Sequence, residues 1–137
     1  MAKVNSRAKG IRGELEAAKL WKEFYPDCER LFGQARYGGS EAPDIGSPLM
    51  NKYWYVEVKR YKSIRQPTID NWKDKLRDDF HKYILTQPEQ DRWAIISVLM
   101  YRGDRAEWRV IIDGRCMTWQ QFKRKDGETW EHIERNL

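Results

Sequence analysis

The run from Trp93 to Met100 most constrains the fold, because nearly all of its residues are apolar. A run of this composition predicts a strand that is buried on both faces, at the centre of a sheet. Other elements must then cover each face of that sheet.

Two amphipathic segments are predicted to form the covering helices. The first begins near Ser6 and runs to about Tyr25, where Pro26 ends it. At a turn of about 100° per residue, its apolar side chains form one stripe: Ala8, Ile11, Leu15, Ala18 and Trp21. The second helix opens at Pro67 and Thr68 and runs to about Leu85. Its stripe consists of Ile69, Trp72, Leu76 and Phe80.

The other segments complete one domain. Strands are predicted at residues 28–37, from Pro43-Asp44-Ile45, at 53–60 and at 108–112, and the capping box of Thr118 and Gln121 starts a short last helix. The resulting order, α-β-β-β-α-β-β-α, predicts an α/β domain in which helices flank a mixed sheet of about five strands. This single domain spans residues 1–137, with residues 1–6 and 126–137 as tails.

The positive charge is concentrated in the first half of the chain. Residues 1–65 contain 13 Lys and Arg against 8 Asp and Glu, whereas residues 66–137 contain 13 of each. The whole net charge of +5 therefore lies in the first half, which suits a polyanionic partner such as nucleic acid.

Composition argues against several other classes of protein. No apolar run approaches the roughly 20 residues of a membrane span, and no apolar segment near the start has the form of a secretory signal. We expect a cytoplasmic protein without a membrane partner. Cys28 and Cys116 stand far apart, as do the two histidines, so we expect reduced, buried or half-buried thiols and no zinc. We also expect no nucleotide cofactor.

An acid and an amine share one face of the strand at residues 53–60. Side chains alternate along a strand, so Trp54, Val56 and Val58 point one way, and Glu57 and Lys59 point the other. Asp44 lies just upstream, at the edge of a short apolar step. These three polar residues are candidates for one site, although an exposed ion pair between strand residues is the simpler alternative.

Glu14 stands apart from the other acids of the first helix. It falls inside the predicted apolar arc, whereas Glu16 and Glu23 fall on the opposite side and are expected to be solvated. An acid on a buried arc must be paired, protonated or bound to a cation. Glu14 is therefore either a rim acid that bridges to a nearby Lys or Arg, or part of the site.

These residue types suit a hard divalent cation. Mg²⁺ takes oxygen ligands and usually only one or two carboxylates, which Asp44 and Glu57 would supply, and the backbone carbonyl of Val58 adds another oxygen. Such an ion polarises a phosphodiester and lowers the pKa of bound water. Lys59 would orient or deprotonate the attacking water, or neutralise charge on the phosphate. Glu14 would reach the ion through water or hold a second one.

Several motifs together resemble those of a known nuclease superfamily. Pro43-Asp44 followed by Glu57-Val58-Lys59 resembles the PD-(D/E)XK signature, and α-β-β-β-α-β is the order of that superfamily's restriction-endonuclease-like core. Residues 6–14 resemble the helix that opens archaeal Holliday-junction resolvases and their phage relatives. Gly38-Gly39-Ser40 is similar to the Gly/Ser loop that precedes the PD step in those proteins, although two glycines also suit a plain turn.

The resemblance implies a function and a set of roles. Asp44 and Glu57 would bind Mg²⁺, for which Mn²⁺ would substitute, Lys59 would be the catalytic lysine, and Glu14 would assist. The expected protein is a homodimer that acts on branched or duplex DNA and resolves four-way junctions, in the cytoplasm of a prokaryotic cell or of the host if a phage encodes it. The alternatives are a restriction-type, repair or flap endonuclease on the same core, or a catalytically silent DNA-binding module.

Basic residues near the proposed site are candidates for contacts with DNA phosphates. They flank the first helix, the Gly/Ser loop and the end of the central strand. The set comprises Lys3, Arg7, Lys9, Arg12, Arg36, Arg60, Lys62 and Arg65, and the resemblance adds Ser40 as a loop serine. Contacts to the backbone suit an enzyme that recognises the shape of DNA rather than its base sequence.

Overall fold

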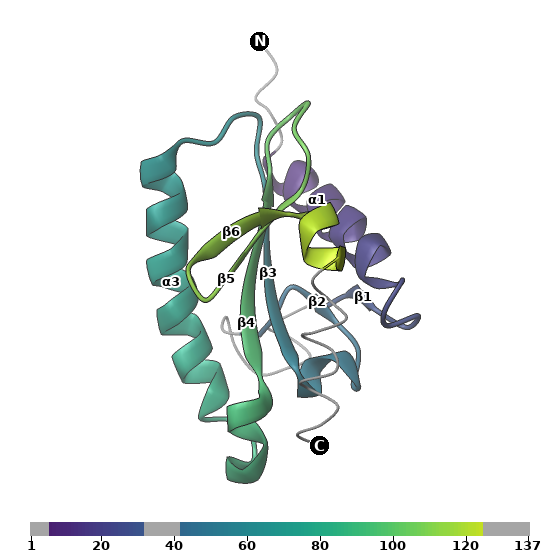
Figure 1. Ribbon diagram of the computed structural model, residues 1–137, viewed down its shortest axis with the longest axis vertical. Coiled ribbons are helices and arrows are strands. Elements are labelled where there is room, and N and C mark those ends of the chain that lie inside the picture. The colour runs from purple at the N-terminus through teal and green to yellow at the C-terminus, as the bar shows by residue number, and fades with distance from the viewer. Residues whose placement is uncertain (1–5, 32–41, 125–137) are drawn as a thin grey trace.

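The protein has an open, mixed sheet at its centre. The computed structural model describes residues 6–31 and 42–124. Within them the sheet has six strands, in the order β1 (Glu29–Arg30), β2 (Ile45–Gly46), β3 (Trp54–Arg60), β4 (Ile96–Arg102), β5 (Arg109–Ile112) and β6 (Arg115–Thr118). Strands β3 and β4 are parallel, and all other neighbours are antiparallel. The prediction of an α/β fold with a mixed sheet is confirmed, with six strands rather than about five (Figure 1).

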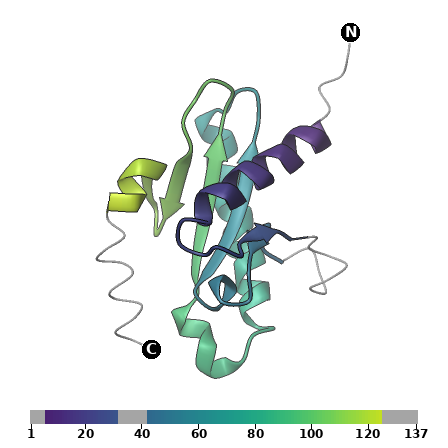
Figure 2. The ribbon, with the colours of Figure 1, turned by 90° about the vertical axis from the view of Figure 1, so that its right-hand side faces the viewer.

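Helices cover both faces of this sheet. Helix α1 (Ser6–Trp21) crosses one face and α3 (Gln66–Ile84) lies on the other (Figure 2). Because β3 and β4 are parallel, the chain must cross over between them, and α3 forms this crossover together with the 3-10 helix η2 (Glu89–Ala94). A shorter 3-10 helix, η1 (Met50–Lys52), precedes β3.

The core consists of one apolar cluster on each face of the sheet. Trp54, Val56 and Val58 of β3 join the cluster beneath α1, whereas Tyr55 joins the cluster beneath α3. The predicted alternation along this strand is therefore confirmed. In β4, Val98 and Leu99 are fully buried on opposite faces, so this strand is covered on both sides as predicted.

The buried face of α1 agrees with the predicted stripe only in part. Ala18 and Trp21 of that stripe are buried, whereas Leu15 is 54% exposed and Ala17, outside the stripe, is fully buried. Gly13, one turn before Ala17, approaches β3 so closely that a Cβ atom there would lie 2.4 Å from the Cβ of Arg60. Small residues allow this close approach of α1 to β3. The approach turns the side of the helix that carries Leu15 toward solvent. The helix also ends at Trp21, before the predicted boundary at about Tyr25.

Several strand boundaries also differ from the prediction. Strand β4 begins at Ile96, and Trp93 lies in η2, where its side chain is 67% exposed. Strand β1 has two residues, and residues 32–37 of the predicted first strand lie outside the described part of the chain. The prediction missed β6, which pairs with β5 through a turn at Asp113 and Gly114, both with positive φ.

Two predicted helix boundaries are confirmed. The second helix was expected from Pro67 to about Leu85 and is observed at Gln66–Ile84. Residues 119–124 are helical, and the predicted capping box is present. In it, the backbone N–H of Gln121 donates to Thr118 Oγ1 at 3.1 Å, and the N–H of Thr118 donates to Gln121 Oε1 at 2.9 Å.

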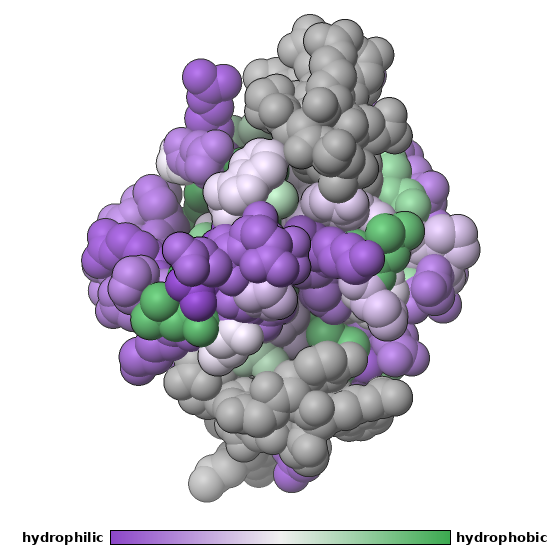
Figure 3. All heavy atoms as spheres, turned by 90° about the horizontal axis from the view of Figure 1, so that it is seen from below, coloured by the Kyte–Doolittle hydropathy of each residue, from purple (hydrophilic) through white to green (hydrophobic). Residues whose placement is uncertain are grey.

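The described residues on the face shown in Figure 3 are largely hydrophilic. The end of the molecule that lies lowest in Figure 1 shows separate apolar patches among polar side chains (Figure 3). No helix in the described ranges is both long and apolar enough to cross a membrane.

Candidate functional site

Backbone and side-chain contacts hold Asp44 beside β3. Its N–H donates to the carbonyl of Val56 at 3.0 Å, and its own carbonyl accepts the N–H of Leu31 at 2.9 Å. Its Oδ2 accepts the N–H of Val58 at 2.8 Å. The N–H and C=O groups of a strand residue point to the same side, so the Val58 carbonyl also faces the side of β3 on which Asp44 lies.

Glu57 and Lys59 lie side by side on one face of β3. Lys59 Nζ is 3.4 Å from Glu57 Oε1, and the two side chains are 19% and 15% exposed. Lys59 Nζ also lies 6.0 Å from the centroid of the Trp72 ring on α3. The predicted ion pair is thus present, and it is half-buried rather than exposed.

Glu14 is half-buried and paired with a cation. The Nε of Arg30 in β1 donates to its Oε2. Burial raises the pKa of Glu14, the Arg30 contact and the charge of Lys59 oppose this, and the Glu57 carboxylate adds to it. Of the alternatives left open by the sequence, pairing with an Arg is observed. Its electrostatic interaction with Glu57 and Lys59 also places Glu14 near the predicted site.

The electrostatics of Asp44 connect all four predicted residues. Burial above all, together with the charges of Glu57 and Glu14, raises the pKa of Asp44 to about 7, although the N–H of Val58 and the charge of Lys59 act in the opposite direction. Side chains from α1, from the segment before β2 and from β3 therefore interact in one cluster.

This cluster has donors suited to Mg²⁺. Two carboxylates and one backbone carbonyl are hard oxygen donors, and Mg²⁺ usually takes one or two carboxylates while keeping several waters. Among residues 6–31 and 42–124, no group of three or more His, Cys, Asp and Glu side chains is arranged to hold a metal ion. Asp44, Glu57 and the carbonyl of Val58 are donors of the kind found in a site of low protein ligand number.

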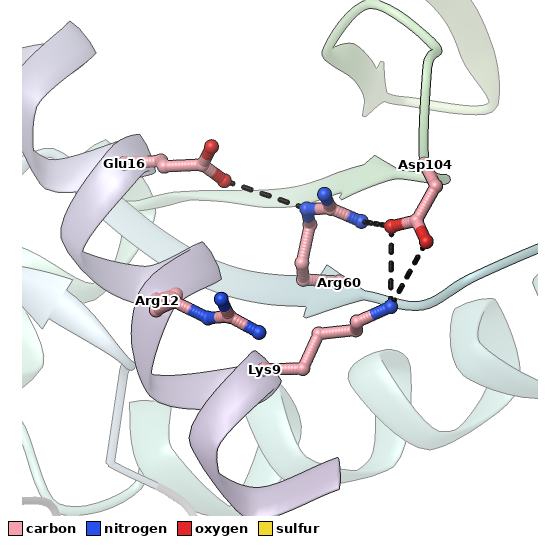
Figure 4. A pocket seen from close by; sticks show the side chains of 5 residues that line it. All are labelled: Lys9, Arg12, Glu16, Arg60 and Asp104. Carbon is pink, nitrogen blue, oxygen red and sulfur yellow. Dashed lines mark hydrogen bonds and ion pairs between the residues drawn. The ribbon is translucent and has the colours of Figure 1, made fainter. Parts of the chain in front are cut away.

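The structure brings together three of the predicted DNA-binding residues. Lys9 and Arg12 of α1 and Arg60 of β3 line an open cleft of about 260 Å³, together with two acids, Glu16 and Asp104 (Figure 4). Arg7 and Lys62 are exposed. Two further candidates, Arg36 and Ser40, lie outside the described residues.

One expectation about the acids of α1 is wrong. Glu16 was expected to be solvated, but it forms ion pairs with Arg60 Nε at 3.4 Å and with Arg102 at 2.9 Å. Glu16 lies on the rim of α1 that faces β4, which explains its ion pair with Arg102. Glu23 is 49% exposed and pairs with Lys123 at 2.8 Å.

Three residues around the candidate site were not predicted from the sequence. Arg30, Arg102 and Asp104 each contact a residue of α1, and the pairs are separated by 16, 86 and 95 positions. No local spacing signals such contacts, because they depend on how α1 lies across the sheet. Cys116, expected to be at least half-buried, is exposed, whereas Cys28 is buried.

Comparison of the chain with protein-family models, with curated proteins and with solved structures found no match. The roles of these residues therefore have to be inferred from their placement and chemistry.

Proposed function

We propose that the protein is a Mg²⁺-dependent endonuclease of the PD-(D/E)XK type that hydrolyses DNA phosphodiesters and resolves four-way junctions. The observation that carries this proposal is the convergence of Glu14, Asp44, Glu57 and Lys59 from three separate elements into one electrostatically coupled cluster. The order α1-β1-β2-β3-α3-β4 supports it, because it is the order expected for a restriction-endonuclease-like core.

Asp44, Glu57 and the carbonyl of Val58 would hold the Mg²⁺ ion, or Mn²⁺ in its place. When bound, the ion supplies Lewis-acid polarisation of the phosphate and a bound water of lowered pKa. The Val58 N–H fixes one oxygen of Asp44, which leaves the other oxygen for a ligand. An Asp44 carboxyl with a pKa of about 7 is readily ionised at slightly alkaline pH, where it can act as a ligand.

Lys59 is placed to act on the water or the phosphate. Its half-buried ammonium lies 3.4 Å from Glu57, so it is held at the edge of the carboxylate cluster rather than in free solvent. There it would orient the attacking water or neutralise charge that develops on the phosphate. Glu14, held by Arg30, would position a water and so act as a positioning residue.

The basic residues would hold the DNA backbone. Lys9, Arg12 and Arg60 gather in one cleft, and Arg7 and Lys62 extend the positive charge on either side along the chain. Contacts of this kind bind phosphates without reading bases, which suits recognition of a branched shape. The proposed active form is a homodimer, because symmetric cleavage of a junction needs two active sites.

The test uses a fluorescent four-way junction, a matched linear duplex and a flap substrate, each with Mg²⁺ and with EDTA. Paired symmetric nicks on the junction alone, dependent on Mg²⁺, are the expected result. Cleavage of duplex or flap as well would favour a restriction-type, repair or flap endonuclease. Binding without cleavage in Mg²⁺ or Mn²⁺ would exclude the enzyme and favour a catalytically silent DNA-binding module.

A further inference from the structure

The cleft beside α1 is separate from the carboxylate cluster. Helical spacing places Lys9, Arg12 and Glu16 on one rim of the buried face of α1, and Glu14 on the other rim. The cleft is closed on its far side by Asp104, in the connection between β4 and β5 (Figure 4). Three cations and two acids thus line it.

Asp104 bridges the cations of two different elements. Its Oδ1 accepts from Arg60 at 2.5 Å, and its Oδ1 and Oδ2 lie 3.2 Å and 3.1 Å from Lys9 Nζ. One carboxylate therefore binds a guanidinium of β3 and an ammonium of α1. A phosphate carries similar anionic oxygens and is bound by Arg and Lys in the same way.

We propose that this cleft binds one backbone phosphate of DNA, and that in the free protein Asp104 occupies the place of that phosphate. The identity of the polyanion rests on the proposed function, whereas the phosphate site itself rests on the cleft. Asp104 is then an internal competitor that weakens binding to any DNA which cannot displace it.

Arg60 is held more firmly than the carboxylate of Asp104. Arg60 packs closely against Gly13, pairs through its Nε with Glu16 and donates to the carbonyl of Tyr61 at 3.0 Å. Its side chain is 14% exposed, against 38% for Asp104. Exposed ion pairs contribute little, so an incoming phosphate can replace the carboxylate.

The side chain of Asp104 can leave while its loop stays in place. The backbone N–H of Asp104 donates to the carbonyl of Lys62 at 3.0 Å, independently of the carboxylate. Arg12 forms no ion pair with any residue of the described ranges, and its guanidinium is turned toward the same space (Figure 4). It would supply a further donor to the phosphate.

The test measures binding of a fluorescent junction and of a duplex by anisotropy, in EDTA, across a range of NaCl concentrations. Asp104→Asn should tighten binding by about threefold to tenfold at moderate salt, because a competing anion is lost. It should also steepen the dependence of log K on log salt by up to about 0.9, as expected for one additional phosphate contact. Asp113→Asn removes the same charge from the exposed β5–β6 turn and serves as the matched control.

A double-mutant cycle identifies the cations involved. Lys9→Gln should weaken binding, and in that background the gain from Asp104→Asn should shrink, because one of the two cations that Asp104 blocks is gone. If Asp104 were purely a structural clamp, Asp104→Asn would instead lower the melting temperature without tightening DNA binding. Equal effects of Asp104→Asn and Asp113→Asn, or full additivity with Lys9→Gln, would overturn the proposal.

A second ligand separates this proposal from the nuclease. Titration with inorganic pyrophosphate tests the anion site without DNA. If neither the wild type nor Asp104→Asn binds DNA, but the variant gains pyrophosphate binding that Lys9→Gln abolishes, the phosphate site stands and the DNA function fails. If Asp104→Asn gains affinity for neither ligand, the phosphate site is wrong, whatever the protein does to DNA.

Discussion

The Oδ2 atom of Asp44 accepts the backbone N–H of Val58 at 2.8 Å, which ties an acid outside the sheet to the strand that carries Glu57 and Lys59. The contact orients one carboxylate oxygen toward the backbone and leaves the other available. It also stabilises the ionised form of Asp44 against burial and against the neighbouring carboxylates. The orientation of Asp44 in the proposed metal site follows from this contact.

Asp44→Asn and Glu57→Gln should abolish cleavage without loss of DNA binding. The amide oxygen of Asn can still accept the Val58 N–H, so the fold is kept while a charged ligand of the proposed metal ion is removed. We expect kcat to fall by about a hundredfold or more, and affinity for the junction to stay equal or increase because less negative charge faces the phosphates. Single-turnover cleavage and anisotropy check both, with the exposed Asp78→Asn as control. Near wild-type cleavage by either variant would contradict the metal site.

The stability of the protein without metal should fall as pH rises, because of Asp44. Burial raises its pKa from 3.8 to about 7, so the folded state binds more protons than the unfolded state within that interval. The contribution of Asp44 to stability is complete below about pH 4 and is lost as pH rises through about 7.

Asp44→Asn does not titrate and should therefore become more stable relative to wild type over that interval. The pKa shift of Asp44 corresponds to at most about 4 kcal/mol of unfolding free energy. Urea unfolding in EDTA at several pH values between 4 and 8 measures the difference, with Asp78→Asn as control. A difference that does not change with pH would show that Asp44 is ionised normally.

The parts of the fold that were predictable are those with local signals. The alternation of Trp54 and Tyr55, the proline near the start of α3 and the capping box at Thr118 each act within a few residues, and each prediction is confirmed. The turn at Asp113 and Gly114 carries the Asp-Gly signal of a tight hairpin, so β6 was also predictable in principle.

The parts that were not predictable depend on how elements pack. The predicted stripe of α1 is confirmed at Ala18 and Trp21 but wrong at Leu15, because the close approach of Gly13 to β3 turns Leu15 toward solvent. The partners of Glu14 and Asp104 follow from that packing. The sequence could group Asp44 with Glu57 and Lys59, because the last two share one strand and a short connection joins Asp44 to it.

Divalent metal should stabilise the wild type and not Asp44→Asn. A ligand that binds only the folded state stabilises it by about 1.4 kcal/mol at ten times its Kd. The stabilisation by metal should be larger at pH 8 than at pH 6, since protons compete with the metal for an Asp44 carboxyl with a pKa of about 7. Thermal unfolding with Mg²⁺, Mn²⁺ or EDTA tests this, and equal stabilisation of the variant would place the ion elsewhere.

Lys59→Gln should remove activity while leaving the fold and the DNA affinity nearly unchanged. Its ammonium is half-buried beside Glu57, so its loss removes a positive charge from the proposed site of cleavage. We expect cleavage to slow by about a hundredfold or more. The control is Lys75→Gln on α3, where the side chain is 65% exposed. If Lys59→Gln weakened DNA binding as much as it slowed cleavage, Lys59 would be a phosphate contact instead.

Gly13→Ala and Gly10→Ala should change stability in opposite directions. A Cβ on Gly13 would lie 2.4 Å from the Cβ of Arg60, which is fixed to the backbone of β3, so helix and sheet would have to separate. A Cβ on Gly10 would meet nothing within 4 Å. Gly10→Ala should stabilise the protein by about 0.5–1 kcal/mol through helix propensity, whereas Gly13→Ala should destabilise it by about 1–3 kcal/mol. Urea unfolding measures both, and a stabilised Gly13→Ala variant would contradict the close packing of α1 on β3.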